Sequence, residues 1–126
     1  MREIEQKWYN MWILFMNEKM PSPYQEILSY ENEVRNGSHL QYFQYFEKEE
    51  NYKAKDFIYI SKNLEGTVLK PIFDAAYEAY VELENKPNAT AEKKLKECDR
   101  VFLKKRNEID AYLKTIAATV DPKFPF

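Results

Sequence analysis

Residues 31–46, ENEVRNGSHLQYFQYF, decide the fold. An Asn-Gly pair between apolar residues is a strong hairpin signal. The flanking residues, however, repeat apolar side chains every three or four positions, which is the period of an amphipathic helix. Gly37 suits the left-handed position after a helix, and Ser38 with Gln41 forms a capping box for the next one. The stretch therefore predicts two helices joined at a corner whose structural residues are Asn36, Gly37, Ser38 and Gln41.

The same helical period continues on both sides of this corner. Ser22, Pro23 and Gln25 form a second start signal, with serine as the cap and proline in the first turn. Gly66 ends a helix, and Pro71 opens another. The expected helices are 2–19, 23–36, 39–49, 53–65, one from 71 to beyond 83, and 91–119. Residues 1–126 therefore predict an all-α fold, a single compact domain of about six helices.

The first expected helix carries two apolar stripes on roughly opposite sides. One contains Ile4, Trp8, Met11 and Phe15, and the other contains Tyr9, Ile13, Met16 and Met20. Two arrangements would bury both stripes. Either the helix lies in the centre of the domain, which we favour, or a second copy of the chain covers one side in a homodimer.

Composition excludes several classes of protein. The chain has 126 residues, a net charge of −2, one cysteine and two glycines, so neither a disulfide framework nor a glycine-rich phosphate loop is expected. The apolar run 11–16 is too short for a membrane span or a signal peptide, and we expect a cytoplasmic protein with no membrane contact. A near-neutral chain does not favour direct nucleic-acid binding. No cofactor or metal motif is found, because Cys98 and His39 alone cannot hold zinc.

Glu31 is the one carboxylate predicted to face inward. It is either a catalytic group with a raised pKa or a structural acid hydrogen-bonded to a tyrosine or to backbone, and we favour the structural role. His39, the only histidine, is expected to be a packing residue in the first turn of its helix. Without a recognisable catalytic motif, the sequence favours a binding protein over an enzyme.

Charges are spread unevenly along the chain. The first 52 residues hold nine acids and five bases, whereas acidic and basic rows in the second half are expected to face each other as Glu82–Lys93, Glu78–Lys96 and Asp74–Arg100. Acids around an exposed tyrosine suit a partner with a basic surface, because charge speeds encounter and the ring anchors the complex. An ordinary solvated face is the alternative. The expected partner-binding residues are Glu26, Glu33, Tyr45, Glu47, Glu49 and Glu50.

Two segments resemble the DNA-mimic-protein-like family, a bacterial group of helical domains. The corner EVRNGSHLQYF at 33–43 resembles the family pattern Glu-Val-x-Asn-Gly-Gly-x-x-Gln-Tyr/Phe-Phe, with Ser38 in place of the second glycine. The segment DRVF at 99–102, followed by Ile109 and YLK at 112–114, is similar to the closing helix of that family. The resemblance covers about residues 24–120.

This resemblance implies a bacterial helical domain that binds another protein. The family is named for a member that imitates DNA with an acidic surface and thereby sequesters a DNA-binding protein. The sequence thus predicts a protein-binding domain that regulates a DNA-binding protein through its acidic surface. A toxin-neutralising immunity protein is an open alternative, and an enzyme using Glu31 is a third.

Overall fold

The computed structural model describes residues 2–123, and these residues form seven α-helices and no strand. The all-α prediction is confirmed, with one helix more than expected. The helices, in chain order, are α1 (Glu3–Met16), α2 (Tyr24–Asn36), α3 (His39–Lys48), α4 (Ala54–Asn63), α5 (Leu69–Asn85), α6 (Ala89–Lys104) and α7 (Arg106–Ala117).

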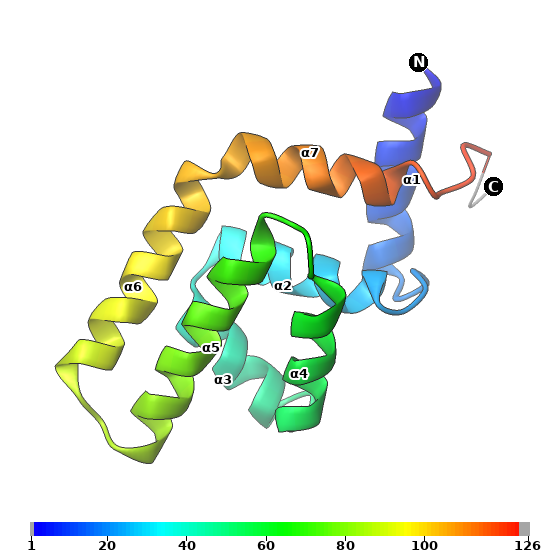
Figure 1. Ribbon diagram of the computed structural model, residues 1–126. Coiled ribbons are helices and arrows are strands. Elements are labelled where there is room, and N and C mark those ends of the chain that lie inside the picture. Colours follow the sequence, from blue (N-terminus) through cyan, green and yellow to red (C-terminus); the bar gives the residue numbers. More distant parts are fainter. Residues whose placement is uncertain (1, 124–126) are drawn as a thin grey trace.

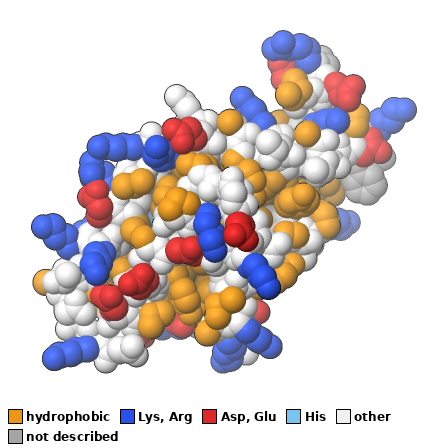
Figure 2. All heavy atoms as spheres, viewed as in Figure 1, with side chains coloured by type: hydrophobic (Ala, Val, Ile, Leu, Met, Phe, Trp, Pro, Cys, Tyr) orange, Lys and Arg blue, Asp and Glu red, His pale blue; other side chains and the backbone are white. Residues whose placement is uncertain are grey.

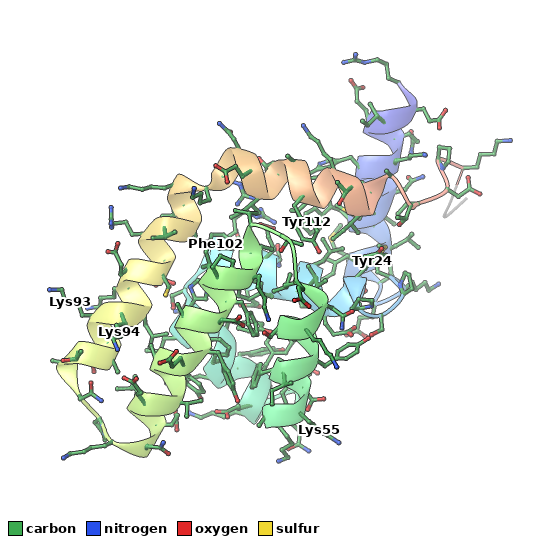
Figure 3. The ribbon with its side chains drawn as sticks, in the orientation of Figure 1. Tyr24, Lys55, Lys93, Lys94, Phe102 and Tyr112 are labelled. Atoms are coloured by element: carbon green, nitrogen blue, oxygen red, sulfur yellow. The ribbon has the colours of Figure 1, made fainter. Side chains whose placement is uncertain are left out.

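Helices α5 and α6 form a long antiparallel pair, against which α3 and α4 pack (Figure 1). Helix α7 turns away from α6 and runs to α1, which lies at one end of the molecule. The core is rich in aromatic rings that meet edge to face, as their quadrupoles favour. Phe102, for example, points inward from α6 (Figure 3). The fully buried rings include Tyr30, Tyr42, Phe43, Phe57, Phe73 and Phe102.

The corner between α2 and α3 forms as predicted, but Gly37 is not left-handed. The Ser38 side chain accepts a hydrogen bond from the Gln41 N–H at 3.1 Å, which confirms Ser38 as the cap, but within the described residues the Gln41 side chain returns no bond to the Ser38 N–H, so the capping box is incomplete. Gly37 has φ −153°, and a Cβ there would lie 3.1 Å from the Glu33 carbonyl oxygen and against the Gln41 side chain. Glycine is favoured here by close approach and not by positive φ. The left-handed glycine is Gly66, at φ +81° after α4.

The predicted cap of α2 is wrong. The helix begins one residue later, at Tyr24, and the Ser22 hydroxyl bonds to Glu26 and, at 2.8 Å, to Tyr59. The Gln25 side chain instead joins α2 to the end of α1, donating to the Phe15 carbonyl at 3.0 Å. Long-range contacts therefore replace the local capping box.

The expected last helix is two helices. Helix α6 ends at Lys104, and Lys105, with φ −91° and ψ 18°, leaves the helical path without any glycine or proline. Phe102 and Ile109 are both fully buried on either side of this break. Because these residues are seven positions apart, a straight helix would also place them on one face, but the bend at Lys105 turns α7 so that it packs on α1 (Figure 1). Tertiary packing has overridden helix propensity here.

Helix α1 is not central, so the favoured arrangement of its two stripes is wrong. Tyr9 is 54% and Met16 70% exposed, and its buried residues are Asn10, Met11 and Leu14. Asn10 determines which side of α1 faces inward. Its amide donates to the carbonyls of Pro122 and Asp121, just after α7, at 2.9 and 3.3 Å. Coverage of the exposed stripe by a second copy stays a prediction.

The facing charge rows are offset from the predicted pairing. Glu82 pairs with Lys94 at 3.7 Å instead of with Lys93, which projects from α6 (Figure 3). Asp74 pairs with Lys70 of its own helix at 3.2 Å. Figure 2 shows positive and negative side chains interspersed on this side of the molecule. Within residues 2–123, no helix has the length and apolarity needed to cross a membrane.

Candidate functional site

A buried tyrosine–histidine cluster joins α2, α3 and α6. It consists of Tyr30, His39 and Asp99, of which the first two have no exposed surface. Asp99 accepts from the His39 backbone N–H at 2.9 Å and from Nδ1–H at 2.6 Å. This fixes the tautomer, so that the Tyr30 hydroxyl donates to Nε2 at 2.7 Å. Each buried polar group of the cluster therefore has a hydrogen-bond partner.

His39 is buried, as predicted, but its hydrogen bonds to Tyr30 and Asp99 were not predicted. The ring packs against Phe43 and Phe102 while bonding at both nitrogens. Burial raises the pKa of Tyr30 well above its ordinary value, with further contributions that include Asp99. The hydroxyl is therefore a fixed donor and has no access to solvent. These contacts make the cluster a structural tie between three helices.

Glu31 is fully buried, as predicted, but its partners are two arginines and neither a tyrosine nor backbone. Arg35 Nε lies 2.9 and 3.1 Å from its two oxygens, and Arg106 Nη2 lies 3.2 Å from one of them. Arg106 also binds Asp110 at 2.8 Å. We call these four residues the arginine cluster. The Glu31 carboxylate neutralises and orients guanidinium groups, so both of its oxygens are already engaged.

The arginine cluster forms the polar end of a cavity of about 570 Å³ between α1, α2 and α7. Trp8, Trp12 and Phe15 of α1 line its other side, and successive rings meet edge to face at 5.9 and 5.6 Å. Sequence periodicity had assigned these rings to apolar stripes without indicating a cavity. We call this site the aromatic cavity.

A second candidate site, the acidic face, lies across α2 and the end of α3. Tyr45 is exposed over 45% of its surface. The negative charge of Glu50 raises the pKa of Tyr45, with smaller contributions from burial, Glu33 and Glu49. A hollow of about 290 Å³ beside it is lined by Glu18, Glu33 and Glu50, among other residues. Of the predicted partner-binding residues, Glu33, Tyr45 and Glu50 therefore line one hollow.

A smaller hollow continues the acidic face. It has a volume of about 260 Å³ and is lined by Glu26, Tyr52, Asp56 and Tyr59. Tyr52 lines both hollows. Burial, Glu26, Asp56 and Glu50 raise the pKa of Tyr52 to about 12. Of these residues only Glu26 was predicted from the sequence. The proximity of Glu18, Tyr52, Asp56 and Tyr59 depends on how α1, α2 and α4 meet, so no local pattern indicates it.

Glu47 is the predicted partner-binding residue that the structure separates from the acidic face. Its carboxylate accepts a hydrogen bond from the Tyr80 hydroxyl of α5. Desolvation, Glu47 and Glu84 raise the pKa of Tyr80. Glu47 therefore has a structural partner in the domain.

No group of three or more His, Cys, Asp or Glu residues within 2–123 is arranged to hold a metal ion. Comparison with known proteins finds no matching family model, curated protein or solved structure. The function must therefore be argued from the two sites themselves.

Proposed function

We propose that this chain is a protein-binding domain that recognises a basic segment of another protein through its acidic face. The proposal is supported by one observation above all: two adjoining hollows, each lined by carboxylates and tyrosine, share Tyr52. A cationic side chain is attracted both to carboxylates and to the faces of aromatic rings. Two neighbouring hollows of this kind suit two basic side chains of one partner segment.

The negative charges of the acidic face are not neutralised by basic side chains, although Glu26 accepts a hydrogen bond from Ser22 and Asp56 accepts one from the Lys53 N–H. Within residues 2–123, no salt bridge involves any of Glu18, Glu26, Glu33, Glu49, Glu50 and Asp56. In contrast, Glu82, Glu97 and Glu108 on α5–α7 each pair with a neighbouring base. Segment 24–52 contains six acids and two bases. Unpaired charge of one sign on one face accelerates association with a surface of the opposite sign.

The partner class follows from this chemistry. DNA-binding proteins present lysine and arginine in grooves that neutralise phosphates, and such a groove suits the acidic face. Together with the resemblance of the corner to DNA-mimic-like proteins, this supports a bacterial regulator of a DNA-binding protein. A basic toxin offers the same charges, and identification of the partner decides between them.

Charge reversal on the acidic face tests the proposal. The tagged Glu33→Lys/Glu50→Lys variant is compared with wild type in affinity capture from the native host, followed by mass spectrometry and by measurement of affinity for the captured partner. The matched control, Glu65→Lys/Glu78→Lys, makes the same charge change at exposed acids elsewhere. We expect the first variant to lose binding by at least about 100-fold and the control to retain it, with wild-type affinity falling as salt rises. Equal binding by both variants would contradict the proposal.

A further inference from the structure

The aromatic cavity has the dimensions and lining of a small-molecule site. Its volume of about 570 Å³ lies within the range of roughly 300–1,000 Å³ typical of ligand pockets. Such sites combine an apolar wall with a few convergent polar groups. Here Trp8, Trp12 and Phe15 provide the wall, and the arginine cluster with Asn32 provides the polar end. The aromatic cavity shares Phe15 and Asn32 with the larger hollow of the acidic face, but none of the carboxylates of that face lines it.

The wall suits a flat ring. Trp8 and Trp12 are only partly buried, and so is Phe15. Their edge-to-face arrangement leaves aromatic surface for a further ring to contact. The Arg35 guanidinium lies 5.4 Å from the centre of the Trp12 ring, which holds that indole at the polar end. A planar aromatic ligand would therefore find contacts already in place.

The polar end carries no net charge. Glu31 and Asp110 offset the charges of Arg35 and Arg106, and each arginine is fixed by a carboxylate at 2.8–2.9 Å. A ligand carboxylate or ammonium group would bring an unbalanced charge into a partly desolvated site, at a cost in free energy. The charge balance therefore favours an uncharged ligand.

Spare hydrogen-bonding groups define the ligand further. Arg106 Nη1 is buried and has no partner within the described residues. The Asn32 oxygen accepts from Arg35 and Asn36, but its amide nitrogen donates no bond there. Asp110 uses Oδ1 for Arg106 and leaves Oδ2 unpaired. The Asn32 amide therefore offers a hydrogen-bond donor, and Asp110 Oδ2 offers an acceptor, to a ligand in the cavity.

We infer that the aromatic cavity binds an uncharged aromatic carboxamide. The ring lies against Trp8 and Trp12, the carbonyl accepts from the Asn32 amide, and the amide nitrogen donates to Asp110. This inference does not rest on the function proposed for the acidic face.

The two tryptophans of the chain both line the cavity, so their fluorescence reports binding directly. Benzamide, benzoate and benzylamine share one ring and are neutral, negative and positive, respectively. We expect a saturable change with benzamide and affinities at least about tenfold weaker for both charged probes, because each charged probe leaves an uncompensated charge in the cavity. No saturable change, or benzoate binding as tightly as benzamide, overturns the inference.

The Asp110→Asn variant provides a sharper test. It removes one negative charge while Glu31 still holds Arg106 at 3.2 Å, so the cavity becomes positive. We expect the ratio of benzoate affinity to benzamide affinity to rise at least about fivefold, since a carboxylate now balances the arginines. Glu108→Gln, which removes an exposed acid of the same helix, is the matched control and should leave the ratio unchanged. An unchanged ratio in Asp110→Asn, with circular dichroism as in wild type, overturns the assignment.

Discussion

Tyr30 and Glu31 are neighbours on α2 and neither has exposed surface, yet they anchor polar clusters of opposite character. In the tyrosine–histidine cluster the Tyr30 side chain is uncharged and lies in the aromatic core. The buried donors and acceptors of this cluster all have hydrogen-bond partners within it. The arginine cluster consists of charges, borders a cavity, and retains a buried donor without a partner.

The difference shows what a buried polar group can be used for. A closed network specifies how helices pack, because any displacement leaves a polar group unsatisfied. A network with spare capacity beside a cavity is prepared for a ligand, because the spare group gains a partner only on binding. One turn of helix α2 presents both arrangements, on different sides.

The largest effect is expected from Glu31→Ala. This change leaves Arg35 and Arg106 without their shared carboxylate, and we expect a loss of about 3 kcal/mol, the low end for breaking a buried ion pair, because both arginines are partly exposed. The free energy of unfolding measured in urea checks it, with Glu33→Ala on the same helix as the control. A loss below about 1 kcal/mol would show that the arginine cluster contributes little to folding.

Asp99→Ala comes next. It removes the acceptor of two bonds from His39, one from the backbone and one from the ring. Since hydrogen bonds to charged groups contribute about 1.5–3 kcal/mol, we expect a loss of about 2–3 kcal/mol in urea unfolding. Glu97→Ala, which removes an exposed pair with Arg100, should cost under about 1 kcal/mol. Equal losses of stability in Asp99→Ala and Glu97→Ala would show that burial does not strengthen the hydrogen bonds of the tyrosine–histidine cluster.

Tyr30→Phe should have a smaller effect. The ring packing is kept, and only the hydroxyl that donates to His39 Nε2 is lost. Leaving this buried nitrogen without a partner should cost about 1–2 kcal/mol in thermal or urea unfolding. A neutral result would show that the cluster is held by Asp99 alone.

The smallest effect is expected from Tyr42→Phe. The Tyr42 hydroxyl is buried without a hydrogen-bond partner in the described residues, although its ring packs on Tyr30 at 5.1 Å. Removal of the hydroxyl should lower the free energy of unfolding by less than about 0.5 kcal/mol, or raise it, because no hydrogen bond is lost. A loss comparable with that of Tyr30→Phe would reveal a partner for the Tyr42 hydroxyl, and the contrast between the two tyrosines would disappear.

Local signals predicted much of the fold. Apolar periodicity located the helices, and Ser38 fixed the start of α3 because its cap bond spans only three residues. The break at Lys105 carries no local signal, since it arises from where α7 packs. Gly37 illustrates the same limit: its presence was informative, but whether conformation or close approach requires it depends on the backbone around it.

Site residues could be predicted from the sequence where the residues involved are close along the chain. Burial of Glu31 and His39 follows from their positions on helix faces, and both were found. Their partners Arg106 and Asp99 lie 75 and 60 positions away, so spacing within one helix could not indicate them. Acids near Tyr45 were found along α2 and α3, whereas Glu47 faces Tyr80 on α5 because the rotation of α3 is set by core packing.

The bond from Asn10 to the Pro122 carbonyl has a consequence for synthesis of the chain. The two residues are 112 positions apart, and α1 also depends on α7 for its packing. At about 5–20 residues per second, a ribosome needs roughly 6–22 s to cover that distance. During this time the tryptophan-bearing helix leaves the exit tunnel without its docking surface. Helix α1 is thus made well before α7, on which it packs, and its apolar side is available to chaperones throughout the delay.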